Sequence, residues 1–238
     1  MRIEIWSDVV CPWCYIGKRR LEKAVTNTGL SPEIVWRSFE LDPSAPREAT
    51  QSVAEHLGDK YGGGPVAGQQ MIDRVEAVAA EEGLIYRLGE AKRANTVDAH
   101  RLLHLALDEG GPQLQGALKE ALLASYFLHA ENPADHDVLR RIAVDAGLPA
   151  SRVDEVLAGV EYADDVESDV REAASIGATG VPFFVIDRKY AVSGAQPVEV
   201  FTQALRQAAS QSLQVVSAVS VDGTDGAERA CGPDGCAI

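Results

Sequence analysis

The chain has 238 residues, of which 46% are apolar and 24% are charged, and its formal net charge at pH 7 is -14. This composition is typical of a globular protein with enough chain for one large or two modest cores. The negative charge repels phosphate backbones and anionic lipid surfaces, so we expect neither a nucleic-acid partner nor a membrane partner.

The N-terminal sequence lacks the pattern of a signal peptide. Residues 1–6, MRIEIW, alternate polar and apolar side chains from the initiator Met1, which indicates a strand. No apolar stretch of roughly 18 residues follows, the length that a transmembrane helix needs. We therefore expect a cytoplasmic protein, in which structural disulfides are rare and paired cysteines are more often catalytic, redox-sensing or metal-binding.

The first 41 residues predict a strand, a helix and a second strand. Residues 2–7 and 33–41 have strand character, although Arg37 interrupts the apolar face of the second segment. Between them, apolar side chains recur at helical spacing after Cys14, and Gly29 is typical of a helix end.

The middle of the chain predicts a connection followed by helices. Residues 42–68 are interrupted by prolines and glycines, which is typical of a long connection or a domain boundary. Residues 99–107 and 138–146 then follow the spacing of amphipathic helices, with Asp135 as the N-cap of the second.

Strand character returns at residues 181–186 and 190–193, and a helix with Pro197 in its first turn follows. The sequence therefore predicts an α/β domain, formed by residues 1–45 and 168–212, that is interrupted by an all-helical insertion domain of residues 46–167. Residues 213–238 form a C-terminal tail to which the pattern assigns no fold.

The segment Cys11-Pro12-Trp13-Cys14 places two cysteines at the start of the first predicted helix. Unpaired N–H groups and the positive end of the helix dipole lower the pKa of a thiol there, and the thiolate is the attacking species. We therefore expect Cys11 to be an exposed nucleophile and Cys14, one turn further on, to be its shielded partner. Pro12 fits the first helical turn, where a missing N–H costs little.

This motif resembles the active site of thioredoxin-fold oxidoreductases, and the helical insertion resembles the DsbA-like branch. The segments WSDVVCPWCYIG (6–17) and GATGVPFF (177–184), with Asn95, Thr96 and His100, more closely resemble FrnE-type proteins, a type named after a polyketide gene cluster. The resemblance implies a thioredoxin-like fold and protein-disulfide oxidoreductase activity without a cofactor. Its implied partners are thiol- or disulfide-containing proteins, with glutathione as a further candidate.

The resemblance also assigns roles near the cysteines. It implies that Pro182 is a cis-proline opposite the pair and belongs to the catalytic residues, and that the Val181 backbone pairs with an extended substrate segment. Pro12 and Trp13 are expected to face the substrate and tune thiolate stability.

A second pair, Cys231 and Cys236, flanks the turn-forming sequence Gly-Pro-Asp-Gly. Such a turn brings the two sulfurs within disulfide reach, so the pair is a candidate accessory redox site. FrnE-type proteins can carry such a pair. The alternatives are a regulatory disulfide, two inert thiols, or metal capture by thiolates.

Rival functions remain open at this point. Kappa-class glutathione transferases and 2-hydroxychromene-2-carboxylate isomerases share the fold but typically have serine at the position of Cys11, and they need no resolving Cys14. A metal-binding or redox-sensing module would use the cysteines without turnover, for example in a four-thiolate zinc site, although we assign no metal ligands. His100 and His104 lack a HExxH glutamate and are interpreted as helix-surface or domain-interface residues. The oligomeric state is left open, a homodimer included.

Overall fold

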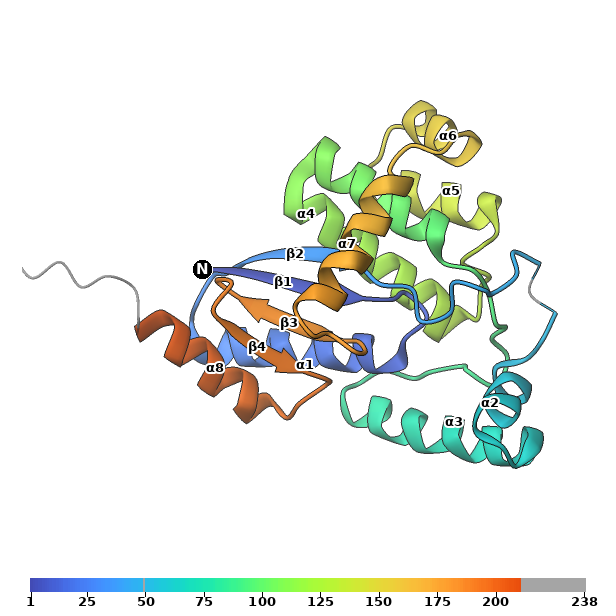
Figure 1. The fold of residues 1–238 in the computed structure, drawn as a ribbon, viewed down its shortest axis with the longest axis horizontal. Helices are drawn as coiled ribbons and strands as arrows, with labels where there is room; N and C mark the ends of the chain where they lie inside the picture. Colours follow the sequence, from blue (N-terminus) through green and yellow to red (C-terminus); the bar gives the residue numbers. More distant parts are fainter. Residues whose placement is uncertain (49, 211–238) are drawn as a thin grey trace, which may run out of the picture.

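The computed structural model describes residues 1–48 and 50–210 of the chain. A four-stranded sheet, ordered β2-β1-β3-β4, is built from β1 (Arg2–Ser7), β2 (Glu33–Ser38), β3 (Phe183–Ile186) and β4 (Tyr190–Ser193). Strand β1 runs parallel to β2 and antiparallel to β3. Strand β1 therefore joins the N-terminal strand β2 and the C-terminal strand β3 in one sheet (Figure 1).

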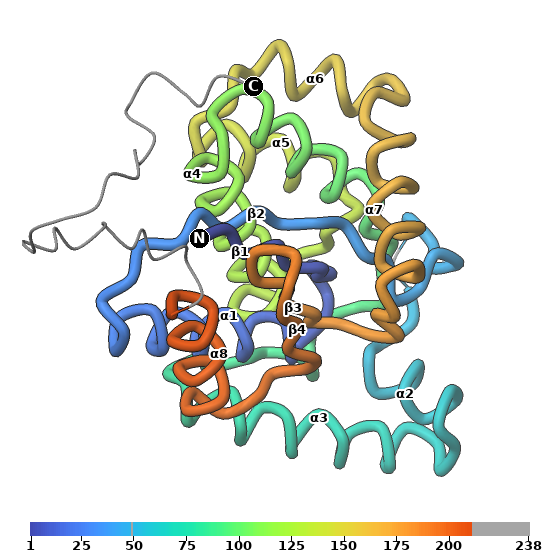
Figure 2. Tube along the Cα trace, turned by 60° about the vertical axis from the view of Figure 1, so that its left-hand side comes forward, coloured from blue at the N-terminus to red at the C-terminus, as the bar shows by residue number. Residues whose placement is uncertain are grey.

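Eight helices surround this sheet within the described residues. They are α1 (Pro12–Thr28), α2 (Val53–Tyr61), α3 (Gly64–Glu81), α4 (Val97–His129), α5 (His136–Asp145), α6 (Ala150–Ala158), α7 (Ala163–Ser175) and α8 (Val198–Ser210). Helices α1 and α8 pack side by side on one face, whereas α4 and α7 contact β2 from the other (Figures 1 and 2). The predicted α/β class is confirmed.

Local sequence signals account for several of these boundaries. Pro12 is at the first position of α1, and Gly29 ends it in the left-handed region (φ 66°). Asp135 caps α5 by accepting hydrogen bonds from two N–H groups, as predicted. The β3–β4 turn places Asp187 (φ 49°) and Arg188 (φ 56°) in the left-handed conformation that tight hairpins require.

Among the described residues, four apolar clusters hold the helices in place. The first joins the sheet to α1 and α8, the second joins α4 to α5 and α6, and the third joins α1, α3 and α4 near the start of α1. The fourth joins β1 and β3 to α7. Tyr15, Tyr86 and Phe127 lie in the third cluster, with the Tyr86 and Phe127 rings 4.6 Å apart. The first turns of α1 are therefore packed against α3 and α4, two helices that come after β2 and before β3 in the sequence.

The prediction of a long connection at residues 42–68 is wrong. Helix α2 and the start of α3 occupy much of it, and Ser52 and Glu55 form a capping box at the start of α2. A Cβ on Gly58 would lie 2.1 Å from the Gly64 carbonyl oxygen, and one on Gly68 would lie 2.0 Å from that of Ala54. These glycines therefore permit backbone contact between two helices. The interruptions on which the prediction rested, Gly62, Gly63, Gly64 and Pro65, lie at the short junction between α2 and α3.

Other boundaries differ by a few residues or stay untested. Strand β2 ends at Ser38, three residues before the predicted Leu41, and β3 begins at Phe183. The predicted domain limits at 45/46 and 167/168 remain a prediction, and residue 168 lies inside α7. None of the helices in the described ranges combines the length and hydropathy that a membrane crossing requires.

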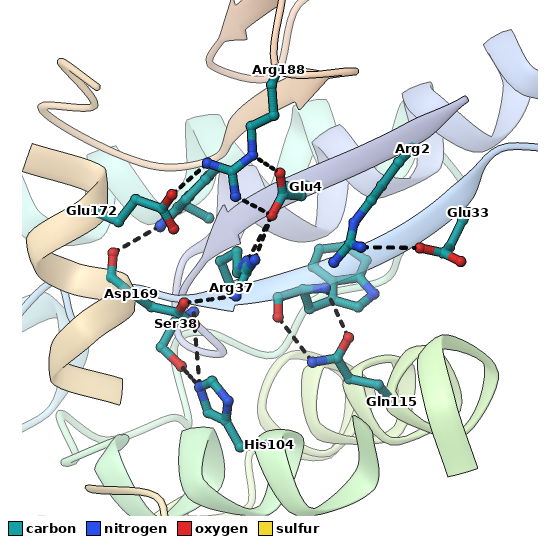
Figure 3. A network of polar contacts seen from close by, with 12 residues as sticks. Arg2, Glu4, Glu33, Arg37, Ser38, His104, Gln115, Asp169, Glu172 and Arg188 are labelled. Carbon is teal, nitrogen blue, oxygen red and sulfur yellow. Dashed lines mark hydrogen bonds and ion pairs between the residues drawn. The ribbon is translucent and has the colours of Figure 1, made fainter. Parts of the chain in front are cut away.

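A buried ion network ties the sheet to α7 (Figure 3). The Glu4 carboxylate on β1 accepts hydrogen bonds from Arg37 on β2, with Nε at 3.0 Å, and from Arg188 of the β3–β4 turn. Arg37 also pairs with Asp169 on α7 at 3.2 Å. Arg37, which interrupts the apolar pattern of its strand, is thus the charge that connects both carboxylates.

The α4 side of β2 is fixed by polar side chains as well (Figure 3). The Gln115 amide accepts from the Trp36 N–H and donates to the Trp36 carbonyl oxygen, both at 2.9 Å. The His104 ring lies 3.1 Å from Ser38 Oγ and 3.2 Å from Asp169 Oδ2. His104 is therefore an interface residue between α4, β2 and α7.

We expect Glu4→Gln to destabilise the protein in a pH-dependent way. Burial raises the pKa of Glu4, but hydrogen bonds from Arg188 and Arg37 outweigh it and lower that pKa below the usual 4.5. The stabilisation is therefore complete above pH 4.5 and is lost as the pH falls through the folded-state value. Hydrogen bonds to a charged group contribute about 1.5–3 kcal/mol, so chemical denaturation at pH 7 should show a loss of that order.

Glu33→Gln is the matched control, because its pair with Arg2 is exposed and such pairs contribute roughly 0–1 kcal/mol. The difference between wild type and Glu4→Gln should shrink as the pH falls below 4.5. A difference that is constant between pH 7 and pH 3 would contradict the role assigned to the network.

Candidate active site

The two cysteines lie at the start of α1, after the short turn that follows β1. Cys11 is the N-cap of the helix, and the Cys14 N–H donates to the Cys11 carbonyl oxygen at 3.0 Å. Both thiols are free, and both are buried, with 3% of Cys11 and 1% of Cys14 exposed. The expectation of an exposed Cys11 is therefore wrong. Trp13, 42% exposed, is the side chain of the motif that reaches solvent.

The loop before β3 closes over Cys11. The Val181–Pro182 peptide bond is cis, as the resemblance implied, and Pro182 is buried. The Cys11 thiol donates to the Val181 carbonyl oxygen at 3.5 Å. The Pro182 carbonyl oxygen accepts from the Gly194 N–H at 2.8 Å, which holds this loop against the β4 end. Two segments 170 residues apart therefore meet at the Cys11 sulfur.

The two thiols share their protons unequally. The hydrogen bond to Cys14, together with burial, raises the pKa of Cys11 well above its usual value. Burial also acts to raise the pKa of Cys14, but the Cys11 hydrogen bond, the Lys119 charge and Ser7 outweigh it and lower that pKa. The two thiols are coupled, so the reduced pair ionises as a unit. The raised pKa of Cys11 differs from the lowered pKa that the sequence had predicted there.

A buried lysine of α4 acts electrostatically on the pair. Lys119, from the middle of α4, is 0% exposed, and its ammonium donates to the Ser7 carbonyl oxygen at 3.3 Å. The Nζ atom also lies 5.3 Å from the centre of the Trp36 ring. Burial lowers the pKa of Lys119 to about 8, although the negative charges of Cys14 and Asp8 oppose this effect.

Asp8 fixes the turn that carries Cys11. Its carboxylate accepts from the Leu41 N–H at 2.8 Å, and the His100 ring lies 3.4 Å from it. Burial raises the pKa of Asp8, but His100, the Leu41 N–H and Lys119 together lower it, so Asp8 is a carboxylate. His100 is fully buried, which rules out the helix-surface interpretation and supports the interface one.

A cleft of about 640 Å³ opens beside Cys11. Pro12, Trp13 and Val181 are among its lining residues, and the Tyr86 hydroxyl donates to the Pro12 carbonyl oxygen at 2.9 Å. The walls are mainly apolar side chains of α2, α3 and the loop after β2, including Leu41, Ala45, Val53, Leu57, Ile72, Val75 and Val78. The three residues predicted to face a substrate thus lie around one opening.

Basic side chains accompany these apolar walls. Lys60, Arg74, Arg93 and His56 all line the cleft, and Asp42 is its one acidic residue among the described lining. Arg93 pairs with Asp42 at 2.6 Å. Lys60 contacts the Tyr61 ring, and Arg74 has no hydrogen bond or ion pair with the residues that the structure describes. The cleft is therefore cationic in a chain whose net charge is -14.

The other predicted sulfurs cannot be placed in this site. Cys231 and Cys236 lie outside the described residues. Within residues 1–48 and 50–210, no group of three or more histidine, cysteine or carboxylate side chains is arranged to hold a metal ion. The alternative of a four-thiolate zinc site depends on Cys231 and Cys236 and is therefore untested.

A cis-proline lies next to a Cys-x-x-Cys turn, and a set of helices is inserted in the chain between β2 and β3 of the sheet. These features define a thioredoxin-fold protein with a helical insertion. Residues 2–206 match the family described as DSBA-like thioredoxin domain. The chain belongs to this family, whose members include oxidoreductases. The finer FrnE-type assignment stays a prediction.

Solved structures place the chain among similar proteins. It is 47% identical to a probable DsbA oxidoreductase from Streptomyces coelicolor, with a TM-score of 0.84 over 100% of this chain and 99% of that one. It shares the fold, at 13% identity and a TM-score of 0.65, with a 2-hydroxychromene-2-carboxylate isomerase over 90% of this chain and 100% of that one. It also shares the fold with the cytosolic disulfide reductase DsbM from Pseudomonas aeruginosa with GSH, at 14% identity and a TM-score of 0.59, over 87% and 98% of the two chains.

Sequence reasoning missed Lys119. Helical periodicity contained a usable signal, because Lys119 shares one face of the helix with Leu122, Leu123 and Tyr126, at spacings of three, four and seven residues. A lysine on an otherwise apolar face predicts either a snorkelling side chain or a buried charge. The structure shows the second case.

Gly17 provides a test of how tightly α1 approaches the cis-proline. A Cβ on Gly17 would lie 3.1 Å from both Pro182 Cγ and Phe184 Cζ, whereas one on Gly116 in α4 would lie 4.0 Å from its nearest neighbour. Both glycines are helical, so Gly→Ala gains about 1 kcal/mol of helix propensity at either site. Overpacking costs about 1–3 kcal/mol, so denaturation should find Gly17→Ala less stable than Gly116→Ala by that amount. Disulfide exchange should slow in Gly17→Ala alone, and equal stabilities would contradict the close approach.

Proposed function

We propose that this protein is a thiol–disulfide oxidoreductase that exchanges disulfides with protein substrates through Cys11 and Cys14. The observation that carries this proposal is the position of the Cys11 sulfur, against the Val181 carbonyl oxygen and next to the cis-Pro182. Cys14 is one helical turn behind it, so a second thiol is available to open or close a disulfide. We assign Cys11, Cys14 and Pro182 to the catalytic residues.

The oxidising reaction takes two thiol exchanges. A substrate thiolate attacks the Cys11 sulfur of the Cys11–Cys14 disulfide, the S–S bond breaks, and Cys14 leaves as a thiolate. A second substrate thiolate then attacks the substrate sulfur of the mixed disulfide, and Cys11 leaves. The substrate loses two electrons to the cysteine pair, and reduction of a substrate disulfide follows the same steps in reverse.

The opening around Cys11 is our proposed substrate-binding surface. The Val181 backbone adjoins the reactive sulfur and offers polar groups to an extended segment, while Pro12 and Trp13 contact residues on either side of the substrate cysteine. Trp13 combines a large apolar area with exposure, which suits such a contact. Because Cys11 is buried, the substrate has to enter this opening to react.

Glutathione is a further partner that we propose for this site. A protein of the same fold, the disulfide reductase DsbM, has been solved with GSH, which supports glutathione as a donor of electrons here. The isomerase of the same fold supports a second candidate, glutathione-dependent isomerisation or transfer. Cys14 favours disulfide exchange over this candidate, because activation of a bound thiol needs no second cysteine.

We also propose that Cys231 and Cys236 form an accessory redox pair that exchanges electrons with Cys11. Both cysteines lie outside the described residues, and about 20 residues separate Ser210, the end of α8, from Cys231.

Mixed-disulfide trapping tests the proposed function. In Cys14→Ala, a substrate attached to Cys11 cannot be released by Cys14, so adducts should accumulate in acid-quenched, alkylated cells. Mass spectrometry should find DTT-sensitive adducts between Cys11 and protein thiols, and a Cys11 adduct with Cys231 or Cys236 would support the relay. Cys11→Ala is the control and should form no such adducts. If Cys11 stays free or carries only glutathione, exchange with proteins is wrong and the glutathione-dependent function takes its place.

The cationic cleft supports a preference for anionic substrates. Lys60 and Arg74 have no carboxylate partner among the described residues, so an acidic group near the substrate cysteine could pair with them. We expect the catalytic efficiency with small disulfides to fall in the order dithiodipropionate, hydroxyethyl disulfide, cystamine. In Lys60→Glu/Arg74→Glu, the catalytic efficiency with the anionic disulfide, divided by that with the cationic one, should fall about tenfold, which is roughly 1.4 kcal/mol.

Arg171→Glu/Lys189→Glu is the matched control, because it makes the same change in net charge away from the cleft. High salt should reduce the preference, since exposed charges are screened. The same substrate ratio in wild type and in the cleft variant would refute the charge preference, while turnover of the neutral disulfide would still support disulfide exchange.

A further inference from the structure

Lys119 is a lysine in the interior of the protein, where charged side chains are rare unless they are paired. Its side chain is completely buried in α4, and it forms no ion pair with any residue of the described ranges within 4.0 Å. A carbonyl oxygen and an aromatic ring are its observed contacts. An ammonium has three donors, and burying it without a counter-charge is costly, so a purely structural role would be served better by an apolar side chain.

The charged groups that act electrostatically on Lys119 all belong to the active site. They are Cys14, Asp8 and Cys11, in order of their effect on its pKa, and the Ser7 carbonyl oxygen that Lys119 binds immediately precedes Asp8. The Asp8 carboxylate already binds the Leu41 N–H and approaches His100, so it is shared with other donors. Lys119 therefore acts on the Asp8 carboxylate and, in addition, on the negative charge that appears on the cysteine pair.

Ser7 adds a second unexplained polar atom at this point. Its carbonyl oxygen accepts from Lys119, and its buried hydroxyl has no hydrogen-bond partner of good geometry among the described residues. Ser7 acts on Cys14 in the same direction as Lys119, favouring its thiolate. The groups beneath Cys14 are thus arranged for a charge that is present in the reduced pair and absent in the disulfide.

We propose that Lys119 is a positioning residue that supplies the counter-charge for the Cys14 thiolate each time the Cys11–Cys14 disulfide opens. The proposal rests on the function proposed above and names how its leaving group is stabilised. A sulfur that leaves as a stabilised thiolate leaves faster, so Lys119 speeds substrate oxidation and favours the reduced pair.

The balance of the step defines what Lys119 changes. Two glutathione thiols reduce the disulfide, giving glutathione disulfide, one Cys11 thiol, one Cys14 thiolate and one released proton. The S–S bond between Cys11 and Cys14 breaks, and an S–S bond between two glutathiones forms. A positive charge beside Cys14 stabilises the product side alone, because the disulfide carries no charge.

The test compares Lys119→Met with Lys18→Met. Met fills a similar volume without charge. Lys18 is a lysine of α1 that pairs with Glu22 and Glu120, and it is not among the main groups that act on the pKa of either cysteine. In Lys119→Met, the equilibrium constant for reduction by glutathione should fall at least tenfold, which is 29.6 mV for this two-electron couple. The midpoint of thiolate formation, followed by absorbance near 240 nm, should rise, and Lys18→Met should match wild type in both. Unchanged values in a folded Lys119→Met protein would overturn the proposal.

A measurement on the wild-type protein covers the case in which Lys119→Met fails to fold. The titration of the Lys119 ammonium, followed by NMR of its side-chain nitrogen, should shift to higher pH when the disulfide is reduced, because a thiolate then lies beside it. Equal titration in the two redox states would overturn the proposal. The thiolate midpoint of the reduced protein needs no substrate, so failure of the proposed function and failure of the role of Lys119 give different results.

Discussion

Much of the site geometry depends on the burial of one carboxylate at the end of the central strand. Asp8 is fully buried, and its oxygens bind the loop after β2 through Leu41 and approach α4 through His100. Its own carbonyl oxygen accepts the Cys11 N–H at 3.3 Å. An unpaired buried carboxylate is costly, so these three segments are held together by the need to keep it satisfied. The position of the cysteine turn therefore depends on the contacts that the buried Asp8 carboxylate needs.

Helix α4 carries this arrangement from the inserted helices to the sheet. The His100 ring approaches Asp8, and Lys119 binds the Ser7 carbonyl oxygen. On α1, Arg19 pairs with Glu120, and the Tyr15 hydroxyl donates to Glu120 at 2.6 Å. The inserted helix therefore brings charged side chains to the cysteine turn, so a change in how α4 packs would alter the electrostatics of the two thiols.

The sequence predicted the elements whose signals are local, and it failed where distant segments decide. The signals at Gly29, at Asp135 and in the alternating strands depend only on residues close by in the sequence. The position of Val181–Pro182 next to Cys11 was predicted from the family resemblance alone. Helix α2 and the start of α3 were missed because the close contact at Gly58 and Gly68 depends on both helices being present. The burial of Cys11 and the thiolate preference of Cys14 depend on Val181 and Lys119, which are more than 100 residues away.

Gln115 has a consequence for how the molecule behaves among its neighbours. Strand β2 is at the edge of the sheet, and such edges offer unpaired N–H and carbonyl groups to other chains. The Gln115 amide imitates a strand by satisfying both backbone groups of Trp36 (Figure 3). It does so from a helix, which cannot be extended by a further strand. The Gln115 side chain therefore occupies two of the backbone groups with which a further strand could pair at this edge.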